Sequence, residues 1–193
     1  MLEVGLLLLV CYLLGAIPFS YLIARARGVD LTKVGSGNIG ATNVYRSVSP
    51  LFGVLAFLCD AGKGFFAAAI VNVFGGPEMI VIGSTLAVLG HTFSPFVGFK
   101  GGKGVATGVG VLFFLQPVVA IIGLASELII IKFTRYVSLA SIVSGVIVFI
   151  LMCLPVFNKE LSYSLFVFIV VAYIIYKHKI NIQRLLKGQE NKI

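Results

Sequence analysis

Two lysines in a glycine-rich stretch, Lys100 and Lys103, are the side chains whose spacing most clearly suggests chemistry. The stretch reads Phe-Lys-Gly-Gly-Lys-Gly over 99–104 and leads straight into a short apolar segment. Glycines let backbone N–H groups approach an anion, a helix N-terminus adds positive potential, and ammonium groups add charge. The sequence therefore predicts an oxyanion or phosphate cradle. A basic anchoring turn is the plainer alternative, but it does not explain the glycines.

A second glycine-rich segment lies at 35–46 and contains a formal Gly-x-Gly-x-x-Gly pattern. A dinucleotide-binding interpretation fails because no strand precedes the segment and no βαβ unit surrounds it. The 99–104 stretch likewise lacks the Gly-x-x-x-x-Gly-Lys-Ser/Thr pattern of nucleotide-binding loops. Its glycines and small side-chain donors instead favour an anion cradle, with a flexible loop as the alternative. The side-chain donors of this segment are Ser36, Asn38, Thr42, Asn43 and Arg46.

Two opposite charges, Asp60 and Lys63, lie three residues apart inside an apolar segment. At helical spacing they can simply pair with each other. Charge inside a membrane span is costly, however, so a functional role facing the protein interior competes with that structural role. The sequence leaves both open.

Two polar groups lie nearer the C-terminus. The segment 178–190 contains His178, Asn181 and Arg184 and has the composition of a basic amphipathic helix at a membrane surface. The segment 135–141 begins an apolar stretch, and we expect its serines to support helix packing. Neither group would indicate catalysis alone.

Membrane helices must position these residues. The 193-residue chain is 59% hydrophobic and 11% charged, more apolar than a soluble domain of this size can bury. The net charge of +8 could suggest nucleic acid, but the basic residues lie between apolar spans, as in cytoplasmic loops. Cys11, Cys59 and Cys153 show neither a metal spacing nor a disulfide framework, so we expect small buried side chains.

Basic and uncharged loops alternate along the chain. The loop at 25–46 and the tail are basic, whereas the turn at 116–117 is uncharged and Asn158-Lys159-Glu160 is neutral. We therefore predict one all-α membrane domain over 1–193, with about seven crossings, the N-terminus outside and the C-terminus cytoplasmic. Merging 105–133 into one tilted span gives six crossings and is the alternative. The predicted spans are Leu2–Ala24, Leu51–Phe74, Met79–Phe96, Val105–Leu115 (too short to cross unaided), Val118–Phe133, Val137–Val156 and Leu161–Tyr176.

Together these motifs resemble the bacterial acyl-phosphate:glycerol-3-phosphate acyltransferase family. The likeness rests on three stretches, 35–43, 90–107 and 178–190, and extends over essentially the whole chain in order and spacing. It implies transfer of a fatty acyl group from acyl phosphate to the 1-hydroxyl of glycerol 3-phosphate. The products would be 1-acylglycerol 3-phosphate (lysophosphatidate) and phosphate, formed at the cytoplasmic side of the bacterial inner membrane during phospholipid synthesis.

The chemistry of acyl phosphate favours direct attack, because its mixed anhydride is already activated. The sequence offers no convincing nucleophile–base triad and lacks the His-x-x-x-x-Asp signature of other glycerolipid acyltransferases, since residue 96 is phenylalanine. Catalysis would then come from positioning and oxyanion stabilisation. The proton acceptor stays open between the acyl phosphate itself, His91 and His178. The main alternative is a membrane transporter of a small phosphate-type anion.

The resemblance and the donor chemistry together give a predicted site. We expect the loop 36–42 to cradle acyl phosphate, and Lys103, Arg46, His178 and Asn181 to hold glycerol 3-phosphate. Membrane lipid is the other expected partner, with no nucleic acid, no obligate protein partner, no cofactor and no metal. The predicted catalytic residues are Ser36, Lys103, His178 and Asn181. The predicted substrate-binding residues are Gly37, Asn38, Gly40, Ala41, Thr42, Asn43, Arg46, Asp60, Lys63, His91, Lys100, Gly101, Gly102, Gly104, Thr107, Ser141, Arg184 and Glu190.

Overall fold

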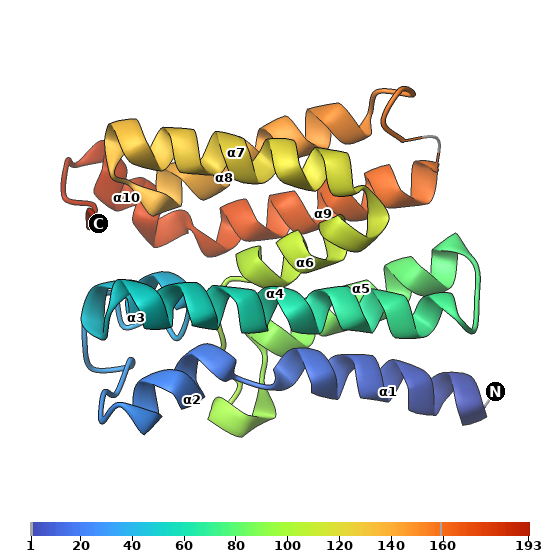
Figure 1. Ribbon diagram of the computed structural model, residues 1–193, viewed down its shortest axis with the longest axis horizontal. Coiled ribbons are helices and arrows are strands. Elements are labelled where there is room, and N and C mark those ends of the chain that lie inside the picture. Colours follow the sequence, from blue (N-terminus) through green and yellow to red (C-terminus); the bar gives the residue numbers. More distant parts are fainter. Residues whose placement is uncertain (1, 159) are drawn as a thin grey trace. The chain divides into compact units, whose positions relative to one another are not determined.

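The computed structural model describes residues 2–158 and 160–193, and within these ranges the regular structure is entirely helical. Lys159, part of the predicted neutral loop, lies outside the described residues. The chain divides into two compact units, Met1–Phe114 and Leu115–Ile193, and each is described by itself. Figure 1 labels the helices of both.

Unit 1 is built on two long helices that both pack against the N-terminal helix. The N-terminal α1 contacts α4 and α5, and α4 also contacts α5. A short helix, α3, packs on α4 and closes the first glycine-rich loop. The elements of this unit are α1 (Leu2–Ala16), α2 (Phe19–Ala26), α3 (Ala41–Ser47), α4 (Pro50–Asn72), α5 (Pro77–Thr92), the 3₁₀ turn η1 (Pro95–Val97) and, up to the unit boundary, α6 (Val105–Leu115).

The predicted first span, Leu2–Ala24, is not one continuous helix. It breaks at Ile17-Pro18 into α1 and α2. Pro18 has no backbone N–H, and its ring clashes with the preceding turn of a helix, so proline inside an apolar span breaks or kinks it. The break releases carbonyl groups of the first helix from intrahelical hydrogen bonding and makes them available to other elements.

Unit 2 contains three longer helices and a short terminal one. α7 (Pro117–Thr134) packs on α8 (Val137–Met152), which packs on α9 (Leu161–Lys177). α10 (Lys179–Leu186) bends away from α9 by 57° and contacts α8 and α9. The helix predicted in the basic tail is therefore present.

Local sequence explains where several helices begin and end. Ser49 caps α4 by accepting a hydrogen bond from the N–H of Phe52 at 3.3 Å, and Pro50 occupies the first turn. Pro77 and Pro117 likewise occupy the first turn of α5 and α7, which have no side-chain cap. α7 ends where Arg135 adopts a left-handed conformation with φ of +63°.

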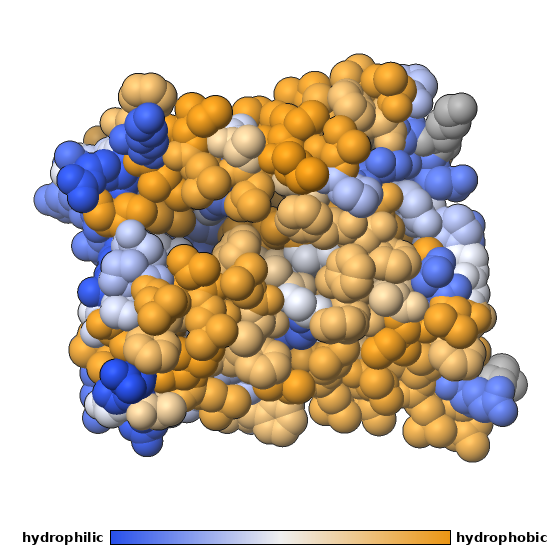
Figure 2. Space-filling view, in the orientation of Figure 1, coloured by the Kyte–Doolittle hydropathy of each residue, from blue (hydrophilic) through white to orange (hydrophobic). Residues whose placement is uncertain are grey.

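The helices have the length and surface of a membrane protein. Four segments are long and apolar enough to cross a bilayer, namely Leu2–Ala26, Pro50–Asn72, Pro77–Val97 and Pro117–Thr134, and the bent pair α9–α10 brings the number to five. α6 has the predicted bounds. Both α6 and α8 are apolar but shorter than these candidate spans. Leu9, Leu58 and Leu128 are each more than half exposed, which suits lipid rather than water. Figure 2 shows mostly hydrophobic residues over α1 and α4. The all-helical membrane fold is thus confirmed, and seven crossings stays a prediction.

Candidate active site

Asn43 holds the first glycine-rich loop in shape from inside. It lies in the first turn of α3 and is 1% exposed. Its Nδ2 group donates to the carbonyl oxygens of Leu31 (3.1 Å), Val34 (3.1 Å) and Asn38 (3.0 Å). Its Oδ1 accepts from the N–H of Ser36 at 3.2 Å. Because one amide side chain bonds to four points of the loop, Asn43 determines where Ser36 lies.

The same loop requires a glycine at position 35, next to the Asn43 side chain. Gly35 has φ of +58°, and an ideal Cβ there would collide with Oδ1 of Asn43.

A second side chain, Asp30, forms a turn upstream of this loop. Its Oδ1 accepts from the hydroxyl and the N–H of Thr32 at 2.7 and 3.1 Å. These two hydrogen bonds lower the pKa of the Asp30 carboxyl, the hydroxyl bond most. Side-chain hydrogen bonds of Asn43 and Asp30 thus hold the backbone of this loop at several points.

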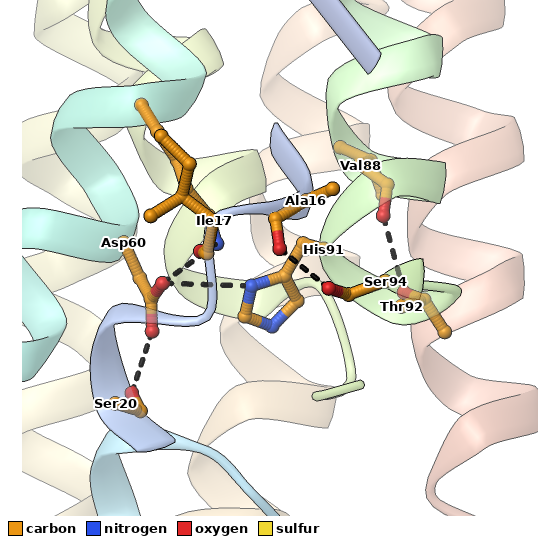
Figure 3. A network of polar contacts seen from close by, with 9 residues as sticks. Ala16, Ile17, Ser20, Asp60, Val88, His91, Thr92 and Ser94 are labelled. Carbon is orange, nitrogen blue, oxygen red and sulfur yellow. Dashed lines mark hydrogen bonds and ion pairs between the residues drawn. The ribbon is translucent and has the colours of Figure 1, made fainter. Parts of the chain in front are cut away.

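The carbonyls released at the break between α1 and α2 accept hydrogen bonds from two other elements. Lys63 of α4 donates through Nζ to the Ile17 carbonyl oxygen at 2.7 Å. Ser94, which follows α5, donates through Oγ to the Ala16 carbonyl oxygen at 2.5 Å. Figure 3 shows the break and its polar neighbours together. Buried carbonyls must find donors, so the break and these side chains stabilise one another.

Asp60 is the centre of the same network. Its Oδ1 lies 2.8 Å from Nζ of Lys63 and 3.6 Å from Nδ1 of His91, and its Oδ2 accepts from Oγ of Ser20 at 2.6 Å. The side chains of Asp60 and Lys63 are each 1% exposed. The helical pairing that the sequence offered as an alternative is therefore present. It is embedded in a larger set of contacts from α2 and α5 (Figure 3).

The second glycine-rich segment folds back onto the end of α5. The N–H of Gly101 donates to the carbonyl oxygen of Thr92 at 2.8 Å, and that of Gly102 donates to His91 at 3.2 Å. A Cβ at Gly101 would collide with the His91 carbonyl oxygen, and one at Gly102 would collide with Nε2 of the His91 ring. The turn that carries Lys103 thus lies directly on His91.

α6 begins immediately after this turn and packs closely on α4. Gly104 has φ of +87°, and α6 starts at Val105, as predicted. A Cβ at Gly64 would collide with the carbonyl oxygen of Thr107, and a Cβ at Gly110 with that of Ala61. Small residues that let helix backbones touch are typical of membrane helix pairs. They set the position of the α6 N-terminus.

Unit 2 contains its own buried polar cluster around Glu190, which is 7% exposed. Its Oε1 accepts from Oγ of Ser138 at 2.9 Å and from Nδ2 of Asn181 at 2.7 Å. His178 lies at the junction of α9 and α10 and donates through Nδ1 to the carbonyl oxygen of Ile174 at 2.8 Å. Glu190 therefore fixes the orientation of the Asn181 amide.

One buried acid escaped the sequence analysis. Glu127 of α7 is 8% exposed and accepts from Oγ of Ser141 on α8 at 2.7 Å. A lone glutamate inside a predicted span is a signal that could have found it, because intramembrane acids face the interior and pair. The pairing gives Ser141 a helix-packing contact, the role expected of the serines at the start of that span.

The predicted residues are compared with the structure within each unit by itself. The structure brings Asp60, Lys63, His91, Gly101 and Gly102 into one connected set, while Asn43 organises the 36–42 loop. Their roles toward substrate stay predictions. The remaining predicted residues of unit 1 are Ser36, Gly37, Asn38, Gly40, Ala41, Thr42, Arg46, Lys100, Lys103, Gly104 and Thr107, and those of unit 2 are Ser141, His178, Asn181, Arg184 and Glu190.

Known proteins match this chain over nearly its whole length. The glycerol-3-phosphate acyltransferase family model matches residues 5–188. The chain is 46% identical to a glycerol-3-phosphate acyltransferase of Syntrophomonas wolfei over 192 residues, covering 97% of this chain and 95% of the relative. It is also 46% identical to that of Aquifex aeolicus over 189 residues, covering 96% and 97%.

Two solved structures of PlsY, described as an integral membrane glycerol 3-phosphate acyltransferase, share the fold. The glycerol 3-phosphate form has a TM-score of 0.93 and 41% identity, covering 99% of this chain and 96% of that one. The lysophosphatidic acid form has a TM-score of 0.90 and 40% identity, covering 99% and 95%. The extent of both kinds of match shows that this chain belongs to the glycerol-3-phosphate acyltransferase family.

Proposed function

We propose that this membrane acyltransferase transfers a fatty acyl group from acyl phosphate to the 1-hydroxyl of glycerol 3-phosphate. Family membership supports the acceptor, and the related PlsY structures are described as glycerol 3-phosphate and lysophosphatidic acid forms, which are an acceptor and its acylated product. The donor is inferred from the resemblance of the motifs. The products are 1-acylglycerol 3-phosphate and inorganic phosphate.

The observation that carries the proposal is the turn Gly101–Lys103 packed on His91. Its backbone is held by hydrogen bonds to Thr92 and His91, and a helix N-terminus follows at Val105. Amide groups, a helix N-terminus and the Lys103 ammonium group suit a phosphate ester. We propose that this turn holds the phosphate of glycerol 3-phosphate, and that the Asn43-ordered loop at 36–42 cradles acyl phosphate.

The proposed reaction needs no acyl-enzyme. The 1-hydroxyl oxygen of glycerol 3-phosphate attacks the carbonyl carbon of acyl phosphate, and a new C–O ester bond forms. The bond between that carbon and the phosphate oxygen breaks, and the phosphate leaves with the bonding electron pair. The hydroxyl proton passes to the leaving phosphate. The residues then contribute positioning and stabilisation of the oxyanion, effects that supply several kcal/mol each in enzymes.

Substrate access supports a reaction at the cytoplasmic face. Acyl phosphate carries a hydrophobic tail, and the exposed apolar side chains of the helices place the protein in lipid. Glycerol 3-phosphate is water-soluble and reaches the enzyme from the cytoplasm. The basic residues of the 25–46 and 99–104 loops predict that both loops lie on that side of a bacterial inner membrane.

Phosphate release from purified protein tests the activity and the donor. The protein is incubated with acyl phosphate, glycerol 3-phosphate or both, and phosphate and lysophosphatidate are measured. Release with both substrates, together with lysophosphatidate, is expected. Activity with an acyl thioester but not with acyl phosphate would overturn the donor. Uptake of phosphate into sealed vesicles without chemistry would favour the transporter alternative.

Replacement of Lys103 tests the cradle. In Lys103→Ala we expect the KM for glycerol 3-phosphate to rise by about tenfold or more, because a charge-assisted contact to phosphate contributes about 1.5–3 kcal/mol. Lys132→Ala removes an exposed lysine from the last turn of α7 and is the matched control. Wild-type turnover in folded Lys103→Ala would contradict the assignment.

A further inference from the structure

A continuous series of contacts connects the break in the first helix to the turn that carries Lys103. It runs from the Ile17 carbonyl through Lys63 to Asp60, from Asp60 to Nδ1 of His91, and from the opposite edge of the ring to Gly102. The series spans four separate segments of unit 1, and Figure 3 labels its residues Ile17, Asp60 and His91. The mechanism proposed above does not use Asp60 or Lys63.

We propose that Asp60, held by Lys63 and Ser20, keeps His91 with its proton on Nδ1 and so positions the Gly101–Lys103 turn. Asp60 and Lys63 are then positioning residues that act through His91, and neither touches substrate. The functional consequence rests on the proposed function, because it assumes that this turn holds the phosphate of glycerol 3-phosphate.

The surroundings of Asp60 favour one fixed orientation of its carboxylate. Ser20 donates to Oδ2, which leaves Oδ1 directed at Lys63 and His91. Lys63 is itself anchored, because its ammonium group also donates to the Ile17 carbonyl oxygen. Removing either residue would leave the other as an uncompensated buried charge. The attraction between the two charges therefore keeps the Asp60 carboxylate beside the Lys63 ammonium group.

The groups that contact the two edges of the His91 ring then determine its position. Nδ1 faces Asp60 Oδ1 at 3.6 Å, slightly beyond hydrogen-bond distance, and an acceptor on that side favours the proton on Nδ1. Nε2, which then presents a lone pair, lies against Gly102, where no Cβ fits. Since the His91 carbonyl also accepts from the N–H of Gly102, both the ring and the backbone of His91 support the turn.

Burial explains why we assign Asp60 and Lys63 a positioning role. Both side chains are 1% exposed, and both contact protein groups outside α4: Lys63 the Ile17 carbonyl and Asp60 the Ser20 hydroxyl. This arrangement resembles second-layer carboxylates in enzymes, which orient a histidine and set its tautomer. A purely structural ion pair is the competing explanation. That explanation requires the two charges to balance, but it does not depend on which nitrogen of the His91 ring carries the proton.

The state of His91 can be measured directly in the intact protein. The chain contains two histidines, so ¹⁵N-histidine labelling gives two sets of ring signals, and those of His178 are assigned with His178→Gln. We expect the protonated nitrogen of His91 to be Nδ1 in the wild-type protein. A proton on Nε2 alone would overturn the proposal without any variant at Asp60, whatever the protein's activity.

Two uncharged double variants separate positioning from charge balance. Asp60→Asn/Lys63→Met retains an oxygen acceptor opposite Nδ1, whereas Asp60→Leu/Lys63→Met has a side chain of similar size without one. Both variants remove the pair, so charge balance is the same. We expect the Asn variant to keep the Nδ1–H tautomer and to have a clearly lower KM for glycerol 3-phosphate than the Leu variant. In the Leu variant we expect the tautomer to change and that KM to rise about tenfold.

The KM for acyl phosphate and kcat show whether the effect is confined to the site for glycerol 3-phosphate. The KM for acyl phosphate and kcat should change little in the Leu variant, since only the turn at 101–103 is displaced. If both double variants behave alike in tautomer and KM, the positioning role is wrong and a structural pair remains. A rise in KM without a tautomer change would also overturn it. Lack of acyl transfer by the wild-type protein would instead refute the proposed function, while the tautomer measurement would still decide the Asp60–His91 relationship.

Discussion

The ammonium group of Lys63 donates to the carbonyl oxygen of Ile17, 2.7 Å away, at the point where Pro18 breaks the first helix. One lysine in the middle of α4 therefore donates to a carbonyl in the break between α1 and α2 and also pairs with Asp60 of α4. Lys63 therefore links the buried charge pair to the break in the first helix.

Lys63→Met is expected to destabilise the protein by about 3–5 kcal/mol, because it leaves Asp60 as an unpaired buried charge. Asp60→Asn/Lys63→Met should recover much of that loss, since no isolated charge remains. Thermal unfolding in one detergent gives both values. Equal destabilisation by the single and the double variant would show that the carbonyl contact, and not the charge, dominates.

Gly64 and Gly62 of α4 allow the close packing of α6 on α4 to be tested with two matched substitutions. A Cβ at Gly64 would collide with the Thr107 carbonyl, whereas nothing lies within 4 Å of a Cβ at Gly62. Gly64→Ala should cost about 1–3 kcal/mol through overpacking. Gly62→Ala should be neutral or stabilise by up to about 1 kcal/mol, through helix propensity. Unfolding midpoints of the two variants test this, and similar midpoints would contradict the close approach of α4 and α6.

Asn43→Ala should loosen the first glycine-rich loop, because each lost hydrogen bond contributes about 1 kcal/mol. Asn43→Asp is the sharper test. It keeps an acceptor for the N–H of Ser36 but places carboxylate oxygen against the carbonyls that Nδ2 now bonds. Both variants should be cleaved faster by protease between residues 31 and 40. We expect Asn43→Asp to be at least as strongly affected, and a wild-type cleavage rate in it would rule out the donor role.

Gly102→Ala should disturb the turn from the side opposite Asp60. Its Cβ would collide with Nε2 of His91, so either the imidazole or the turn must move. We expect the KM for glycerol 3-phosphate to rise by about tenfold or more, as in Lys103→Ala. Gly5→Ala, at a helical position with open space around the Cβ, is the control. Unchanged kinetics in a folded Gly102→Ala protein would mean that the turn does not hold substrate.

The buried contact between Glu127 and Ser141 should depend on an acceptor and not on charge. Glu127→Gln retains an oxygen for the Ser141 hydroxyl, so we expect little change in stability. Glu127→Leu removes it and leaves the buried hydroxyl unsatisfied, at a cost of about 1–3 kcal/mol. Adding Ser141→Ala to Glu127→Leu should recover part of the loss. Thermal unfolding of the three variants checks the order, and a large loss in Glu127→Gln would indicate that the carboxylate charge itself is required.

The sequence by itself determined the features that depend on local chemistry. Long apolar stretches predicted membrane helices because a bilayer core requires about 20 apolar residues in a helix. Glycine and proline at its two ends predicted the bounds of α6, Val105–Leu115, because these residues limit helices locally. The glycine-rich motifs also identified the family, since their order and spacing are properties of the chain alone.

Only the tertiary structure decided which polar groups meet. Pro18 signals a break locally, but the donors that satisfy the released carbonyls, Lys63 and Ser94, lie 46 and 78 residues away from their acceptors. In the same way, the spacing of Asp60 and Lys63 permitted a pair but could not place His91 beside it. Such contacts depend on how each helix is rotated about its axis and how deeply it packs. Those quantities are set by the fit of whole helix surfaces, so no local pattern in the sequence contains them.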